Sequence, residues 1–293
     1  MSCCGLWRPC KKGSPDGPAD RRAPSALDEA ENQKRFMCLI FVAYKYQSPY
    51  DLVIAANRDE FYERPSAPAG FWKEAPSVLG GKDLMAGGTW LGITRTGRFA
   101  AITNYRDPGS HKHQAPSRGH LVSGFLTGKE APGEYVRNIA SGADEYNGFS
   151  LFVGDRSSIY YLSNRGSGPQ DLPPGLYGLS NHLLDTPWPK VERGKKALER
   201  LLAGTDHVRE EALFDILADR NRPPDELLPH TGMSLEWERI LASPFIVSPV
   251  YGTRSSTVIL IGRDGKVAFF EKVFNSNPNP QEIRRFEFVL DEP

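Results

Sequence analysis

The fold of this chain is decided by a stretch that reads Arg35-Phe36-Met37-Cys38-Leu39-Ile40-Phe41-Val42-Ala43-Tyr44. A continuous apolar run of this length is typical of a strand that is covered on both faces. The run starts at Cys38, which is the one cysteine beyond residue 10, so its thiol is expected at a strand end. If the chain were cleaved after Met37, Cys38 would carry both a thiol nucleophile and an α-amine of pKa ~7.7–8.0, a pair that can perform acyl transfer. The alternative interpretation is a small buried hydrophobe at the edge of a core strand.

The composition argues against several classes of protein. The 36 basic and 36 acidic residues cancel over 293 residues, so bulk charge gives no support for a nucleic-acid partner. Three of the four cysteines lie in the first ten residues and form no disulfide framework for a chain of this size, which favours a reducing, cytoplasmic compartment. No apolar stretch reaches the roughly 18–20 residues of a transmembrane helix. No metal-ligand motif is complete, so we predict no structural metal.

Residues 1–36 differ from the rest of the chain. They are rich in Pro, Gly, Ala and charge, and they show no apolar periodicity. A segment of this composition cannot bury enough apolar surface to offset its ordering entropy, so we expect a disordered leader or pro-segment. It also lacks the continuous apolar region of a signal peptide. A single domain is expected over residues 37–293.

Apolar patterning from Cys38 onward predicts strands, then helices, then strands. The expected strands are 38–46, 52–56, 89–94, 99–103, 149–153, 159–162, 257–261, 267–270 and 286–290. The expected helices are 117–126, 133–139, 187–202, 210–218 and 234–241, with Ser234 as a cap for the last. The clearest hairpin turns at Arg263-Asp264-Gly265. This order, with little strict alternation, predicts an α+β layered domain with largely antiparallel sheets.

Four polar clusters adjoin expected strands. Asn57-Arg58-Asp59-Glu60 follows strand 52–56, where an aspartate could hold an ammonium or thiol and an arginine could hold a carboxylate. Thr103-Asn104-Tyr105-Arg106 ends strand 99–103 and offers an amide donor for an oxyanion. Tyr177-Gly178-Leu179-Ser180-Asn181 offers a second amide, and Tyr251-Gly252-Thr253-Arg254-Ser255-Ser256 places a cation at a strand entrance. Caps and surface ion pairs explain any one cluster better than a site does, but four clusters at strand ends, with Cys38 at a fifth, favour a site.

These segments resemble the NRDE family, that of Transport and Golgi organisation protein 2. The namesake motif is matched by Asn57-Arg58-Asp59-Glu60-Phe61-Tyr62-Glu63-Arg64-Pro65-Ser66, and the family's typical opening Met-Cys by Met37-Cys38. The resemblance spans essentially Met37 to the C-terminus. Its further motifs are Gly87-Gly88-Thr89-Trp90-Leu91-Gly92-Ile93, Thr103-Asn104-Tyr105, Tyr146-Asn147-Gly148-Phe149, Tyr177–Lys190 and Tyr251–Thr257.

The family in turn resembles the N-terminal-nucleophile hydrolases, particularly the bile-salt hydrolase and penicillin V acylase group. That resemblance implies a four-layer αββα sandwich with two mostly antiparallel sheets between helices. It implies that Cys38 is the nucleophile, that its own α-amine is the base, and that Asp59 orients this amine. Asn104 and Asn181 would be oxyanion or substrate donors, and Arg254 would tune the nucleophile. The expected substrate-binding residues are Arg58, Asn57, Tyr105 and Trp90, although those hydrolases carry their arginine three positions before the aspartate, where this chain has Ala56.

Two functions remain open at this point. The first is an amidohydrolase that acts, without a cofactor, on a linear non-peptide C–N bond such as that of an N-acyl amine or amino acid. The second is a trafficking protein for haem or an acyl ligand, since eukaryotic family members are tied to lipid homeostasis, Golgi organisation and haem trafficking. In that case Arg58 or Arg254 would pair with a carboxylate, and Cys38 could ligate haem iron. The expected apolar walls are Trp72, Trp90, Trp188 and Tyr105, for which core packing is the plain alternative.

Overall fold

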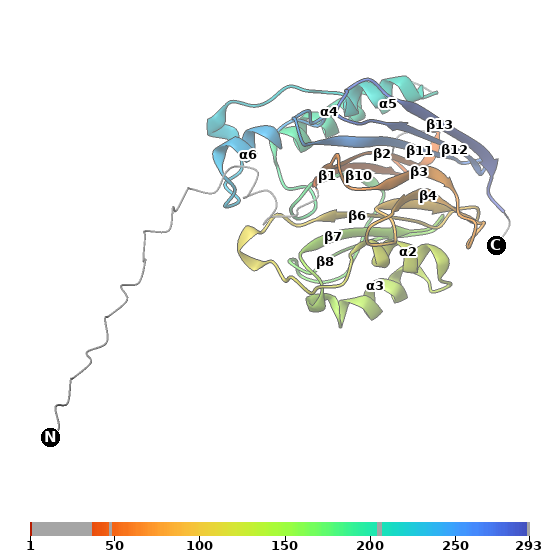
Figure 1. Ribbon diagram of the computed structural model, residues 1–293. Coiled ribbons are helices and arrows are strands. Elements are labelled where there is room, and N and C mark those ends of the chain that lie inside the picture. Colours follow the sequence, from red (N-terminus) through yellow and green to blue (C-terminus); the bar gives the residue numbers. More distant parts are fainter. Residues whose placement is uncertain (2–36, 47–48, 204–206, 292–293) are drawn as a thin grey trace. The chain divides into compact units, whose positions relative to one another are not determined.

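The computed structural model describes residue 1 and residues 37–46, 49–203 and 207–291. The segment from Arg35 to Pro293 forms one compact unit. The expected leader, residues 1–36, lies outside the described residues except for Met1. Within the described part, two antiparallel sheets stack face to face (Figure 1).

The first sheet has six strands in the order β10-β1-β2-β11-β12-β13, and each neighbouring pair is antiparallel. Its strands are β1 (Met37–Tyr44), β2 (Tyr50–Phe61), β10 (Gly175–Leu179), β11 (Tyr251–Gly262), β12 (Lys266–Val273) and β13 (Glu282–Val289). The second sheet has seven strands in sequence order. They are β3 (Ser66–Phe71), β4 (Val78–Asp83), β5 (Leu91–Thr94), β6 (Phe99–Asn104), β7 (Phe149–Gly154), β8 (Ile159–Ser163) and β9 (Gln170–Asp171).

Helices cover the outer face of each sheet (Figure 1). Those on the first sheet are α4 (Pro189–Ala203) and α5 (Glu210–Leu217), and those on the second are α2 (Gly119–Thr127) and α3 (Pro132–Ala140). A short helix, α6 (Leu235–Ile240), precedes β11, and 3₁₀ turns lie at Pro108–Ser110, Ala143–Glu145 and Asp225–Leu227. The expected four-layer αββα architecture is therefore confirmed. None of the helices in the described residues is both long and apolar enough to cross a bilayer.

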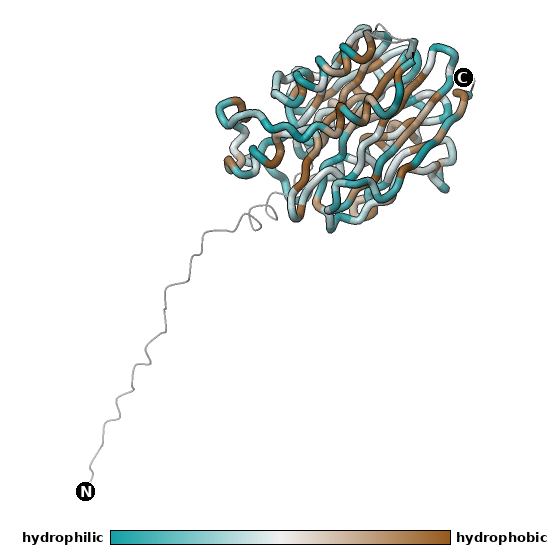
Figure 2. The backbone as a smooth tube through the Cα atoms, turned by 90° about the horizontal axis from the view of Figure 1, so that it is seen from above, coloured by the Kyte–Doolittle hydropathy of each residue, from teal (hydrophilic) through white to brown (hydrophobic). Residues whose placement is uncertain are grey.

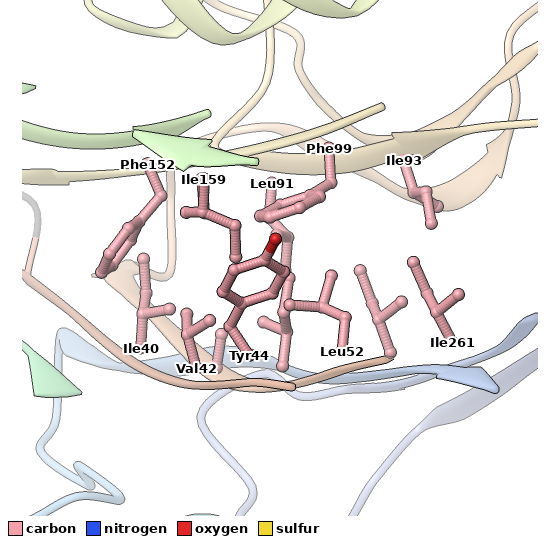
Figure 3. Packing of buried hydrophobic residues seen from close by; sticks show 14 of the residues in the cluster. Ile40, Val42, Tyr44, Leu52, Leu91, Ile93, Phe99, Phe152, Ile159 and Ile261 are labelled. Carbon is pink, nitrogen blue, oxygen red and sulfur yellow. The ribbon is translucent and has the colours of Figure 1, made fainter. Parts of the chain in front are cut away.

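The apolar run of β1 is continuous because both faces of the strand are buried. Ile40, Val42 and Tyr44 point into the core between the sheets, where Figure 3 shows them opposite residues of the second sheet such as Phe152. Leu39, Phe41 and Ala43 point the other way and pack beneath α4 and α5. Figure 2 shows hydrophobic segments gathered along the strands of the domain, with hydrophilic ones at its turns.

Helix α4 approaches the first sheet unusually closely through two glycines. A Cβ added to Gly194 would lie 2.0 Å from Cζ of Phe41, and one added to Gly178 would lie 2.6 Å from Cγ1 of Val191. Because real Cβ atoms never approach so closely, only glycine lets the start of α4 rest on β1 and β10. These contacts determine where the first turn of α4 lies above the sheet.

Two central strands are longer than the sequence predicted. The motif Asn57-Arg58-Asp59-Glu60 lies inside β2 rather than after it, and Thr253 to Ser256 lie inside β11. All four motif residues are buried, with alternate side chains directed to opposite faces of a strand that is paired on both sides. A prediction from hydrophobicity ends a strand where polar residues begin, whereas here the polar residues lie inside the central strands and are buried. Strands β3 and β4 were also missed, since Pro68 and three glycines weaken the apolar pattern of their segments.

Candidate active site

Cys38 is the second residue of the central strand β1, and it is a free, buried cysteine that is 5% exposed. Its Cα pairs with that of Arg58, while Met37 pairs with Asp59. The backbone nitrogen of Cys38 therefore lies beside Asp59, and its side chain shares the inner face of the sheet with Ile40. With the chain intact, burial and the Asp59 charge raise the pKa of the thiol to about 12, although Arg58 opposes the shift.

Asp59 is fully buried on the outer face of β2. Its Oδ1 accepts a hydrogen bond from Oγ1 of Thr253 at 2.6 Å, and that hydroxyl oxygen accepts one from the backbone N–H of Ile246. Its Oδ2 is buried and has no hydrogen-bond partner among the described residues. Burial raises the pKa of this carboxyl to about 7, although Lys190, the Thr253 hydroxyl and Arg58 each lower it.

Lys190, in the first turn of α4, is a site residue that sequence reasoning missed. It is 2% exposed, and its Nζ donates to the carbonyl oxygen of Leu241 at 2.9 Å. Burial and Arg106 lower the pKa of Lys190, while Asp59, Cys38 and Glu238 raise it. A signal was present in the sequence, since Lys190, Gly194 and Leu198 follow the i, i+4, i+8 spacing of one helix face. A lysine on the apolar face at a helix N-terminus also opposes the helix dipole.

The inner face beside Cys38 carries a row of polar side chains. Arg58 stands between Cys38 on β1 and Ser255 on β11, and its guanidinium stacks 4.4 Å from the ring centroid of Trp90. Its Nη2 lies 3.6 Å from Oε2 of Glu60. Burial raises the pKa of Glu60 to about 7 against the opposing charges of Arg58 and Arg64. Across the described residues, Arg58 Nη1, Glu60 Oε2 and Ser255 Oγ are buried without a hydrogen-bond partner.

The structure brings Asn104 and Asn181 together with Cys38. Asn181 follows β10 and is fully buried, and its Nδ2 donates to the backbone oxygen of Asn104 at 3.1 Å. The hydroxyl oxygen of Ser180 lies 3.3 Å from the carbonyl oxygen of Cys38 and 3.2 Å from Oδ1 of Asn181. Thr103 and Arg106 anchor the same loop through hydrogen bonds to the backbone oxygens of residues 180 and 181. The end of β6 in the second sheet and the residues that follow β10 in the first sheet are therefore in contact at Asn104 and Asn181.

Tyr105 lies next to this pair, in an aromatic group. Its hydroxyl and Nε2 of His182 are 2.7 Å apart, and Nδ1 of His182 is 2.8 Å from Oγ1 of Thr186. Trp188 packs against the His182 ring and beneath the guanidinium of Arg106. Nη1 of Arg106 and Oε2 of Glu238 form a buried ion pair at 2.5 Å.

Three of the expected residues have contacts elsewhere. Asn57 lies on the outer face, where its Nδ2 donates to the backbone oxygens of Leu217 and Pro244 and its Oδ1 accepts from Ser256. Arg254 lies at the register shift in β11 and donates to the backbone carbonyls of Phe61 and Arg64, at and after the end of β2. Trp72 packs in the core between the second sheet and its helices and donates to the Gly80 carbonyl. These contacts anchor the sheet and its loops.

No group of three or more His, Cys, Asp or Glu residues in the described part of the chain is arranged to hold a metal ion. The donors near Cys38 are instead amides, hydroxyls, carboxylates and three cations. This set can polarise a carbonyl and move a proton.

Comparison with known proteins gives a family match and two weak structural likenesses. The family model described as Transport and Golgi organisation 2 matches residues 37–276. The bovine Transport and Golgi organization protein 2 homolog is 39% identical over 277 residues, which cover 87% of this chain and 99% of that protein. A variant of conjugated bile acid hydrolase from Clostridium perfringens is 9% identical, with a TM-score of 0.45 over 86% of this chain and 97% of the other. The Caenorhabditis elegans ortholog of N-acylethanolamine-hydrolyzing acid amidase is 13% identical, with a TM-score of 0.47 over 76% of this chain and 92% of the other.

Proposed function

The chain belongs to the Transport and Golgi organisation 2 family, and from the geometry around its cysteine we propose that it is an N-terminal-cysteine hydrolase of linear, non-peptide amides. The observation that carries this proposal is the Asp59 carboxyl group, which is fully buried on β2, the strand that pairs with the start of β1 at Met37 and Cys38. Its Oδ2 lacks a hydrogen-bond partner among the described residues. Leaving a buried charged acceptor unpaired costs about 1–3 kcal/mol or more, and a freed α-amine at Cys38 would satisfy it.

In the proposed reaction, cleavage after Met37 exposes the α-amine of Cys38. This amine takes the proton of the thiol as the sulfur attacks the amide carbonyl. It then gives the proton to the leaving nitrogen, the C–N bond breaks, and an acyl thioester remains on Cys38. The amine next deprotonates a water molecule that attacks the thioester, which releases the acid and restores the thiol.

The amides of Asn104 and Asn181 would donate to the oxyanion of each tetrahedral intermediate. Asn181 is linked to Cys38 through the Ser180 hydroxyl, which contacts both the Cys38 carbonyl oxygen and Oδ1 of Asn181, and Nδ2 of Asn181 donates to the backbone oxygen of Asn104. These links support the role, and the loss of one oxyanion donor typically costs ~10²–10³ in rate. Arg58 Nη1 and Ser255 Oγ are further donors whose hydrogen bonds a bound substrate could complete. Tyr105 and Trp90 would supply apolar contacts to the substrate.

The test is amide turnover by a chain whose first residue is Cys38. A panel of N-acyl amines and N-acyl amino acids should include at least one that is hydrolysed, and Cys38→Ala should abolish that activity. The control is the full chain, in which the amine of Cys38 is held in a peptide bond and turnover should be absent. Full activity in Cys38→Ala would refute the proposed nucleophile.

A second candidate is the binding of haem or a carboxylate-bearing acyl ligand by the intact chain. The buried guanidinium of Arg58, stacked on Trp90 with one nitrogen that has no partner in the described structure, favours it. Haem titration of the full chain should then give a saturable spectral change at micromolar protein that Arg58→Met weakens. A spectrum that stays unchanged on titration would count against this candidate.

A further inference from the structure

Lys190 and Asp59 lie in the same buried layer, above the outer face of the first sheet. Asp59 directs its carboxylate to this face, and the Thr253 hydroxyl that it accepts is itself bound to the backbone of Ile246. Lys190 reaches the layer from α4, where its Nζ donates to the carbonyl oxygen of Leu241. The segment 241–246 therefore connects the two groups: Ile246 at one end contacts the Thr253 hydroxyl that donates to Asp59, and Leu241 at the other end accepts from Lys190.

The position of Lys190 is closely constrained. Val191 packs against Gly178 of β10, and Gly194 packs against Phe41 of β1, at distances that leave no room for even one methyl group. With this turn held on the sheet, the Lys190 side chain stays buried, at 2% exposure. The ammonium group of Lys190 therefore has a fixed position in the site.

Four other charged or titratable groups face Lys190. Arg106 and Glu238 form an ion pair with each other; Arg106 lowers the pKa of Lys190, and Glu238 raises it by a smaller amount. The remaining two are Cys38, which is a neutral thiol at rest, and Asp59. Besides Lys190, Asp59 is faced by Arg58, Cys38, Tyr62 and the Thr253 hydroxyl. No hydrogen bond joins Lys190 to Asp59 among the described residues, so Oδ2 of Asp59 stays open to a donor from Cys38.

We propose that Lys190 is a positioning residue that favours the ionised form of Asp59, which holds the α-amine of Cys38, and that its own charge favours the unprotonated form of that amine. The inference rests on the proposed function, because it assigns Lys190 a role in the same site. A buried carboxylate without a nearby cation takes up a proton, and a neutral acid holds an amine less strongly. Two cations that share one carboxylate each lose affinity for their protons, so the amine becomes a free base at neutral pH.

The first test measures the protonation of Asp59 in the full chain, where no cleavage is needed. Aspartate labelled with ¹³C at the carboxyl carbon reports each titration by NMR, and Asp59→Asn identifies the signal. In Lys190→Met the titration midpoint of Asp59 should rise by at least one pH unit, which is about a tenfold change in the protonation equilibrium. The matched control is Lys195→Met on the same helix, which removes only the exposed ion pair with Asp185 and should leave the midpoint unchanged.

An unchanged Asp59 midpoint in Lys190→Met would overturn the inference. If that variant does not fold, Lys190→Gln keeps a donor for the Leu241 carbonyl and supports the same measurement. The second test uses the chain that begins at Cys38, in which Lys190→Met should move the acidic limb of the turnover profile to higher pH. A shifted Asp59 midpoint without amide turnover supports the role of Lys190 and refutes the hydrolase. Amide turnover together with an unshifted Asp59 midpoint supports the hydrolase and refutes the role of Lys190.

Discussion

The thiol of Cys38 should be almost inert in the folded, intact chain. Burial raises its pKa to about 12, against ~8.5 for an unfolded cysteine. At pH 8 the thiolate fraction is then about 10⁻⁴ rather than about 0.24, a difference of roughly 2,400-fold. A more basic thiolate is a better nucleophile, and a Brønsted coefficient of ~0.4–0.5 over ~3.5 pKa units returns a factor of about 25–55. The expected alkylation of Cys38 is therefore about 40–100-fold slower than in the unfolded chain, and slower still because the sulfur is shielded.

The assay is alkylation by iodoacetamide, followed by peptide mapping of Cys38 in native buffer and in urea. The same cysteine in urea is the reference, so differences between peptides do not enter the ratio. The native rate should also keep rising with pH beyond pH 10, where an unfolded thiol has already reached its plateau. Native and unfolded rates within fivefold of each other would refute the buried, neutral thiol. Exposing the α-amine provides a base that can take the proton of the thiol, so the chain that begins at Cys38 should react faster than the full chain.

Three further predictions concern the buried charges and the packing near the site. Burial raises the pKa of Glu271 to about 7. The neutral carboxyl therefore stabilises the fold below pH ~4.5, and this contribution is lost as the pH rises through 7. Glu271→Gln should make the free energy of unfolding in urea less dependent on pH, and the variant should be up to about 3 kcal/mol more stable than the parent at pH 8. Gly194→Ala should destabilise by about 1–2 kcal/mol in the same assay, because an overlap as close as that with Phe41 costs about 2–3 kcal/mol and the helix propensity of alanine returns ~1. Arg106→Met should cost about 3–5 kcal/mol by leaving Glu238 buried and unpaired, and the double replacement of both partners by methionine should recover most of the loss.

Each of these predictions has its own control or contrary result. Glu271→Gln keeps an acceptor for the backbone N–H of Ala69, and equal pH dependence in both proteins would contradict the raised pKa. Gly70→Ala places its Cβ in open space and should stay within about 0.5 kcal/mol of the parent, whereas a Gly194→Ala protein as stable as the parent would show that α4 can move. A double variant no more stable than Arg106→Met alone would contradict the ion-pair argument for Arg106 and Glu238.

Much of the fold follows from local pattern. The expected helices agree with α2 to α6 to within about two residues at most ends, because each carries an apolar stripe that faces a sheet. The hairpin at Arg263-Asp264-Gly265 joins β11 and β12, with Gly265 at φ 78° as such a turn requires. The prediction ended β2 too early and started β11 too late, since buried polar residues inside a central strand give no apolar signal. The edge strand β3 was missed for the opposite reason, because an edge tolerates proline and needs few apolar residues.

The candidate site divides in a similar way. Cys38, Asp59, Asn104 and Asn181 were expected from their motifs, and the structure places them around one strand end. Asn57 and Arg254 come from the same motifs, yet their side chains bind backbone carbonyls of the scaffold. Alternation explains the difference for Asn57, which points to the outer face while its neighbour Arg58 points inward. A motif identifies the strand but does not say which face of it meets the ligand.

The amino-acid sequence alone predicts that the apolar run 38–44 lies in a strand buried on both faces, because an unbroken apolar run loses free energy wherever one face meets water. It also determined that a single thiol stands at the start of that strand. The charges that surround this thiol are known only from the tertiary structure. Lys190 is about 130 residues from Asp59 in sequence, and their electrostatic coupling depends on two glycine contacts that seat α4 on the sheet. Long-range electrostatics depends on distance in space, which no local pattern of residues encodes.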